Sequence, residues 1–201
     1  MTRLELLDWR RQVAAIYHAV RECPDPAAAH EQWVARRTEL HRTHPESAAR
    51  DLELQHAPYD DRMRFVVAVD ASAEPESIDV ATATDGVVHY ERVGQVRLGQ
   101  LGTLDVWWAA VYGGGIWLPI RDRSAHTYGG GRYVLDTVKG ADLGNATDPR
   151  SGRDGLVVDL NFAYNPSCAY DEAWACPLPP AGNVLTTEVP VGELLPTARE
   201  S

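Results

Sequence analysis

Hydrophobic residues recur with helical spacing over the first twenty positions of the chain. Charged residues separate a stripe of apolar side chains: Leu6, Trp9, Val13, Ile16, Tyr17 and Val20. A stripe of this kind predicts an amphipathic helix over residues 3–20. Pro24 and Pro26 then interrupt the pattern, because proline cannot continue a helix through its interior.

A second helix is predicted directly after this break. Asp25 can cap its start, and Pro26 suits the first helical position, where no backbone hydrogen bond is lost. We expect the helix to end near Arg42. Its buried side is assigned three residues: Trp33, Val34 and Leu40. Its exposed side is assigned four charged residues: Glu31, Arg36, Arg37 and Glu39.

From Met63 onward the pattern changes to short β-branched or aromatic runs, which turn residues separate. The runs occupy residues 64–70, 78–84, 87–99, 104–120, 132–138, 156–164 and 184–192. Runs at this spacing, with no helical stretch between them, predict antiparallel strands. We therefore expect an α+β protein, mainly β, in which an antiparallel β-sandwich or barrel-like body carries an N-terminal helical segment.

The pattern predicts one domain over residues 1–201, in which a helical segment (1–42) packs on a β body (63–195). A length of 201 residues suits a single domain with its own hydrophobic core. The polar stretch 140–155 is expected to be a surface loop.

Composition narrows the range of partners. Nineteen basic against twenty-nine acidic residues give a net charge of −10, which repels polyanions and argues against nucleic acid. No stretch approaches the roughly 18 apolar residues of a membrane span, and the first residues lack the pattern of a signal peptide. We therefore expect a cytoplasmic protein with no membrane partner. An odd number of cysteines argues against a disulfide framework: Cys23, Cys168 and Cys176.

Two windows, residues 117–133 and 157–183, hold most of the chemically capable side chains. In the first, three glycines separate Tyr128 from Arg132 and would let backbone N–H groups approach an oxyanion that Arg132 neutralises. The same glycines suit a hairpin with positive φ angles, and both interpretations stay open. Arg121 is a second candidate charge partner.

Asp122 and Cys168 are the candidate catalytic residues. Asp122 precedes His126 by four positions, and a carboxylate can orient an imidazole as a general base, although such proximity is commonplace. Cys168 could be a nucleophile, a member of a reversible disulfide with Cys176, or a buried apolar residue. Seven residues separate the two cysteines, which exceeds the spacing of a zinc knuckle. Together with His126 and Asp122 they could still supply four metal ligands, but no metal site is assigned.

Asp159 and Asn161 share one face of the run 156–164, because side chains alternate along a strand. If that face points into a cleft, both become ligand-binding groups, and Asn165 just beyond the run joins them. If it points to solvent, they belong to an ordinary surface strand.

Three segments together resemble the bacterial domain-of-unknown-function family 1684: TYGGGRYVLD, VVDLNFAYNPSCAYDEAWACPLPPAGNVL and VPVGE. The resemblance covers about residues 40–195. Matching positions include Asp122, Tyr128, Arg132, Asp159, Asn161, Asn165 and Cys168. His126 falls where the chain departs from the family pattern, which counts against it as a shared base. The resemblance implies no activity, substrate or cofactor.

We expect the two windows to form a polar cleft that binds a small polar or anionic molecule, through Arg121, Tyr128, Arg132, Asp159, Asn161 and Asn165. An alternative is a hydrolase- or transferase-type enzyme that uses Cys168 or Asp122. A third hypothesis is structural, with Arg132 paired to Asp122 or Asp159 in a buried network. No cofactor and no oligomeric state are assigned.

Overall fold

The computed structural model describes residues 2–82, 86–148 and 151–199, and its first elements are two α-helices. α1 spans Arg3–Glu22, and Thr2 caps it in a capping box with Glu5. α2 spans Pro26–Thr43, and the Asp25 side chain accepts the N–H of Ala27 at its start. Both predicted helices are confirmed, including the capping residue of the second.

Three antiparallel sheets make up the rest of the fold. The largest has the order β3-β4-β5-β6-β7, with β3 at Ser77–Thr82, β4 at Gly86–Arg97, β5 at Thr103–Ala109, β6 at Gly115–Ile120 and β7 at Arg132–Asp136. The second has the order β2-β9-β8, with β2 at Arg64–Val67, β9 at Asp154–Asp159 and β8 at Asn145–Thr147. The third pairs β1 at Leu52–Glu53 with β10 at Thr197–Ala198.

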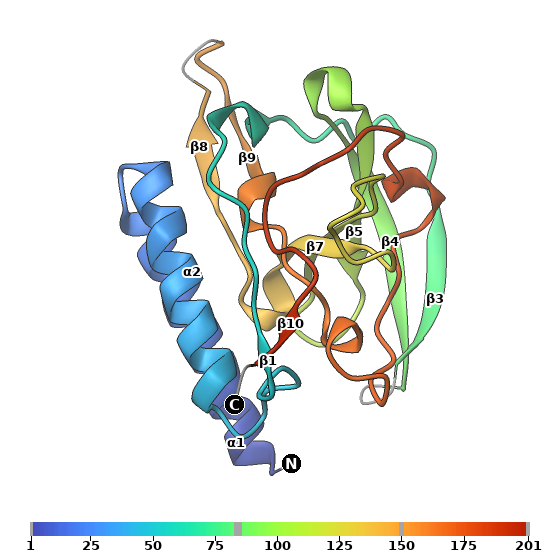
Figure 1. Cartoon of the computed structure of the whole chain (residues 1–201). Helices are drawn as coiled ribbons and strands as arrows, with labels where there is room; N and C mark the ends of the chain where they lie inside the picture. Colours follow the sequence, from blue (N-terminus) through green and yellow to red (C-terminus); the bar gives the residue numbers. More distant parts are fainter. Residues whose placement is uncertain (1, 83–85, 149–150, 200–201) are drawn as a thin grey trace.

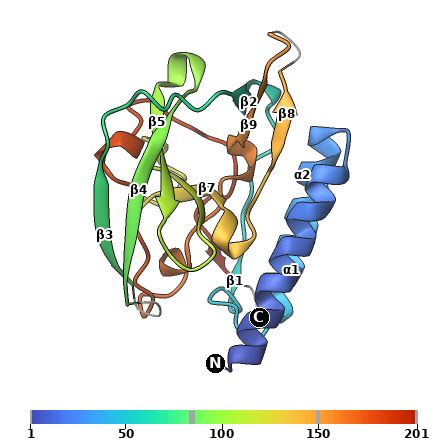
Figure 2. The same cartoon turned by 180° about the vertical axis from the view of Figure 1, so that it is seen from behind.

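The expected fold class, α+β and mainly β with antiparallel sheets, is confirmed. The large sheet ends at β3 on one edge and β7 on the other, so it does not close into a barrel. The helix pair lies along one side of the molecule and β3 lies on the opposite side, with β8 and β9 between them (Figures 1 and 2). No helix in the described part of the chain is long and apolar enough to span a membrane.

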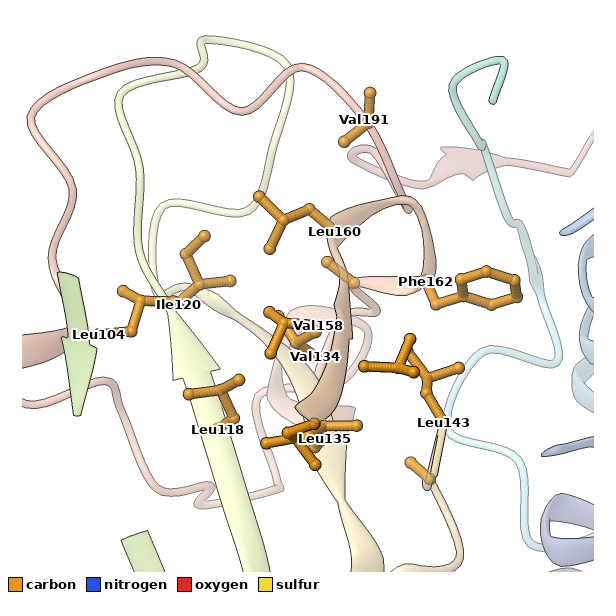
Figure 3. Packing of buried hydrophobic residues seen from close by; sticks show 14 of the residues in the cluster. Leu104, Leu118, Ile120, Val134, Leu135, Leu143, Val158, Leu160, Phe162 and Val191 are labelled. Carbon is orange, nitrogen blue, oxygen red and sulfur yellow. The ribbon is translucent and has the colours of Figure 1, made fainter. Parts of the chain in front are cut away.

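The hydrophobic core lies where the sheets and the helix pair meet. Figure 3 shows Leu118 of β6, Val134 of β7 and Val158 of β9 pointing toward one another, and all three are fully buried. Phe162 extends the same cluster toward α2, where its ring packs edge-on against Trp33. The core therefore joins the helices to the β body.

Two expected runs and one expected loop take a different form. The run 156–164 is a strand only to Asp159, because the Asp159 carboxylate caps a 3-10 helix, η4 (Leu160–Phe162). The run 184–192 forms no strand; backbone groups of its last residues bond to buried side chains instead. The stretch 140–155, expected to be a loop, contains β8, and its residues 149–150 lie outside the described part.

Candidate functional site

The two chemically dense windows lie against each other. Backbone groups of Tyr133 and Tyr164 pair in both directions, each at 2.9 Å. The Tyr128 hydroxyl lies 3.5 Å from the carbonyl oxygen of Cys168 and 3.9 Å from its Sγ. The windows therefore meet, as the cleft hypothesis requires.

Arg132 uses its guanidinium to hold a neighbouring backbone segment, residues 189–195, which we call the C-terminal strap. Arg132 is fully buried, and Nη2 donates to Asp122 Oδ1 at 3.2 Å and to the carbonyl of Val189 at 2.9 Å. Nη1 donates to the carbonyls of Val191 and Glu193. Burial lowers the pKa of Arg132, and the Asp122 carboxylate opposes that effect.

Asp122 is held equally firmly. Oδ2 accepts the backbone N–H groups of Ser124 at 3.0 Å and Val189 at 2.8 Å. Oδ1 accepts from the Thr127 hydroxyl at 3.3 Å as well as from Arg132. Both carboxylate oxygens are therefore occupied, in the kind of buried network that the structural hypothesis describes.

Asp159 and Asn161 fix the loop before β2. Asn161 accepts the N–H of Asp60 and donates to its carbonyl, both at 2.8 Å. Asp159 accepts from Asn161 at 2.8 Å and from the Tyr59 hydroxyl at 3.3 Å, and Arg64 Nε lies 3.7 Å away. Burial raises the pKa of Asp159 to about 6. Asp159 also lines a cavity of about 190 Å³ beneath the start of α2.

The remaining predicted residues of the first window lie nearer the surface. Arg121 is exposed, and its backbone groups bond to Asn183 and Leu185. Asn183 is buried, and its side-chain oxygen accepts from the Trp107 indole at 2.8 Å. Its amide nitrogen donates to the carbonyl of Pro119 in β6 at 2.9 Å, so Asn183 holds the chain just after residues 176–180 on the large sheet.

The thiols of the second window are free and close together. The backbone N–H of Cys168 donates to Cys176 Sγ at 3.4 Å, and neither cysteine forms a disulfide. Burial raises the pKa of Cys176 to about 11, so its thiol stays protonated at neutral pH. No three histidine, cysteine or acidic side chains gather into a metal-binding group in residues 2–82, 86–148 and 151–199.

A cavity of about 110 Å³ lies between the helix pair and the β body, and we call it the helix–body cavity. α1 contributes Tyr17, and α2 contributes Arg37 and His41. The end of β7 and the residues after it contribute Asp136 and Lys139. The second window contributes six more lining residues: Tyr164, Asn165, Pro166, Ser167, Tyr170 and Cys176.

Two ion pairs neutralise the charges of this wall. Arg37 Nη2 and Nε lie 2.9 Å and 3.0 Å from Glu193 Oε2, and the Glu193 side chain is fully buried. The Tyr170 hydroxyl donates to the other Glu193 oxygen. Lys139 Nζ lies 3.3 Å from Asp136, whose carboxylate raises the pKa of Lys139. The cavity therefore has polar walls with no unpaired charge among these groups.

Three of the residues that line the cavity have a buried polar atom without a hydrogen-bond partner: Tyr17 Oη, His41 Nε2 and Asn165 Oδ1. Burial raises the pKa of Tyr17, so the hydroxyl keeps its proton, and its neighbour Trp33 offers only an N–H. Burial and Arg37 lower the pKa of His41 well below its usual value, so the imidazole is neutral. Asn165 Nδ2 donates to the carbonyl of Leu194 at 2.8 Å, which leaves Oδ1 as the free acceptor.

The helical half of this site differs from what the sequence pattern predicts. Arg37 was placed on the exposed side of α2, but its side chain is only 9% exposed because Glu193 neutralises it. One signal was present: Arg37 and His41 are four residues apart and share a helix face with Trp33. Polar side chains on the same helix face as a buried tryptophan are themselves expected to be at least partly buried and to need hydrogen-bond or ion-pair partners.

Fold and site define an α+β protein whose helix pair closes a small polar cavity on an antiparallel β body. The chain belongs to the family described as protein of unknown function (DUF1684), whose model matches residues 52–194. It is also similar to an uncharacterised protein of Haloarcula marismortui, solved by solution NMR, with 28% identity over 80% of this chain and 89% of that one and a TM-score of 0.55. No curated protein matches. The resemblance found in the sequence is therefore confirmed.

Proposed function

We propose that this protein binds a small polar molecule in the helix–body cavity. The observation that carries the proposal is that three residues lining the cavity, Tyr17 and His41 from the helices and Asn165 from the β body, each have a buried polar atom without a hydrogen-bond partner. Buried polar atoms in native proteins nearly always have a partner, and each one without a partner costs about 1–3 kcal/mol. A bound molecule that bonds to all three would remove that cost.

The size of the cavity limits the ligand. A volume of about 110 Å³ equals the share of roughly four molecules in liquid water. Pockets that bind drug-sized ligands have volumes of about 300–1,000 Å³. The ligand therefore has only a handful of non-hydrogen atoms.

The cleft residues expected from the sequence then have two separate roles. Asn165 contacts the ligand, whereas Arg132 and Asp122 hold the strap that carries Glu193 behind the cavity. Arg37 replaces Arg121 and Arg132 as the arginine of the site.

Catalysis by Asp122 or Cys168 is the weaker candidate. Both oxygens of Asp122 are occupied by four donors, so the carboxylate has no free position from which to move a proton. The Cys168 thiol accepts from the Tyr128 hydroxyl at 3.9 Å and lies beside the Cys176 thiol, and neither group is a base that would form the thiolate.

Location and partners complete the proposal. The free thiols of Cys168 and Cys176, which lie close enough to interact, support a reducing compartment such as the cytoplasm. The net charge of −10 supports a small molecule over nucleic acid as the partner.

The test is a fragment screen by NMR on the isotope-labelled full chain, with polar fragments of about eight non-hydrogen atoms or fewer. We expect a binding fragment to shift resonances of Asn165, Tyr17 and His41. Val13→Phe should remove this binding, because Val13 lines the cavity and a larger side chain fills it.

Val20→Phe is the matched control, because Val20 lies on the same helix but lines the other cavity. Binding that survives Val13→Phe, or that is lost equally in Val20→Phe, would refute the proposal.

A further inference from the structure

We infer that the ligand of the helix–body cavity is an uncharged molecule that both donates and accepts hydrogen bonds, of the kind that small carboxamides represent. This inference rests on the proposed function and specifies its ligand. It follows from the way charge and hydrogen-bonding capacity are distributed on the cavity wall.

The first step concerns charge. Arg37 is paired with Glu193, and Lys139 with Asp136, so two cations face two anions. His41 is neutral and adds no charge. A charged ligand would bring an unpaired charge into a site where the existing charges already neutralise one another, and burying such a charge is costly.

The second step concerns the free atoms. Asn165 Oδ1 is an acceptor that needs a donor from the ligand, because its amide nitrogen is engaged by Leu194. The Tyr17 hydroxyl proton needs an acceptor, since the adjacent Trp33 can only donate. A carboxylate would satisfy Tyr17 but would place a negative oxygen against Asn165. An ammonium would satisfy Asn165 but has no acceptor for Tyr17.

The third step concerns shape. Aromatic side chains form much of the wall, and Tyr133 and Tyr164 meet edge to face with centroids 5.9 Å apart. Flat rings around a small volume fit a flat polar group better than a tetrahedral one. A planar amide satisfies the shape, the charge and both kinds of hydrogen bond.

The experiment uses three probes of the same planar shape and different charge: acetamide, acetate and acetamidinium. Each is titrated into the labelled full chain at neutral pH, and the dissociation constant is read from the shifts of cavity resonances. We expect acetamide to bind at least about tenfold more tightly than either ion. Acetate or acetamidinium binding as tightly as acetamide would overturn the inference and leave the proposed function intact.

The remaining outcome also separates the two proposals. If none of the three probes shifts the cavity resonances while another small fragment does, the inference fails and the proposed function stands. If no fragment at all binds there, the proposed function fails with it.

Tyr17→Phe tests the role of the hydroxyl directly, because it removes one oxygen and keeps the ring. We expect about tenfold weaker acetamide binding, together with an unchanged or higher melting temperature of the ligand-free protein. Tyr112→Phe is the control, since Tyr112 is fully exposed, and it should change neither quantity. A Tyr17→Phe protein that melts several degrees lower would show that the hydroxyl has a structural partner and would overturn the argument.

Discussion

Replacing the buried Arg37 with methionine should destabilise the protein far more than the same change at an exposed arginine of α2. Methionine keeps the unbranched apolar stem of arginine and removes the guanidinium. Glu193 then remains fully buried and loses the charge-assisted hydrogen bond from Nε at 3.0 Å, together with the ion-pair contact to Nη2 at 2.9 Å. The Tyr170 hydroxyl loses a second charge-assisted hydrogen bond, which it accepts from Nη2 at 3.1 Å. The backbone N–H of Asn165 and the Tyr170 hydroxyl still donate to the Glu193 carboxylate, but the cation that forms an ion pair with it is gone.

The magnitude follows from these contacts. A hydrogen bond to a charged group contributes about 1.5–3 kcal/mol, and two are lost. Removing one member of a buried ion pair generally costs about 3–5 kcal/mol, which agrees with that sum. We therefore expect Arg37→Met to lower the free energy of unfolding by about 3–5 kcal/mol, a large fraction of the roughly 5–15 kcal/mol typical of a folded domain.

Urea unfolding, followed by tryptophan fluorescence and far-ultraviolet circular dichroism, measures this change. Arg42→Met is the matched control, because Arg42 is on the same helix and pairs with Glu39 at 2.7 Å, with both side chains more than half exposed. It should cost less than about 1 kcal/mol. The double variant Arg37→Met/Glu193→Gln should recover part of the loss, because it removes the unpaired charge. A cost below about 1 kcal/mol for Arg37→Met, or strictly additive effects in the double variant, would refute the reasoning.

Three further predictions concern backbone strain and pH. Gly131→Ala should lower the free energy of unfolding by about 1–3 kcal/mol, because φ is +93° and a Cβ would lie 2.5 Å from a ring atom of Pro179. Gly129→Ala is the control: a Cβ there meets nothing within 4 Å, so the change should be nearly neutral, and urea midpoints compare the two variants. The pKa of Asp159 is raised to about 6, so its contribution to the free energy of unfolding is largest at low pH. The stability of the wild type relative to Asp159→Asn should therefore fall by about 1.4 kcal/mol per pH unit as pH rises from about 4 to 6. A stability difference that does not change with pH contradicts this. Burial lowers the pKa of His56 to about 4 and holds the pKa of His41 well below its usual value, so the free energy of unfolding should fall as pH drops below about 6.5. His56→Gln should reduce that slope in the same unfolding series.

The sequence predicts those parts of the fold that short-range patterns determine. Both helices follow from apolar spacing and from caps that lie next to the residues they serve, such as Asp25. β8 was missed because it is only three residues long and mostly exposed, and it exists through pairing with β9. The run 184–192 has the composition of a strand, but Arg132 binds carbonyls there that a neighbouring strand would otherwise bind.

The site was harder to predict because its main contacts are distant in sequence. Arg37 looks like a surface residue in the periodic pattern of α2, and charged side chains are rarely buried unless they are paired. Its partner Glu193 lies 156 positions away, and no local pattern connects the two. Asn165 was predicted because it stands in a dense window, which is a local signal.

The dense windows and the cavity are mechanically connected through the C-terminal strap. Arg132 binds the carbonyl of Glu193 from one side of the strap, while the Glu193 side chain reaches Arg37 and the backbone of Asn165 on the other. The Asp122–Arg132 pair thus fixes the position of the carboxylate that orients Arg37 on the cavity wall. Residues that look catalytic in the sequence can therefore shape the wall of the helix–body cavity without lining it. So many polar residues gather in these windows because the buried guanidinium of Arg132 needs an anion and several carbonyl groups within hydrogen-bonding distance.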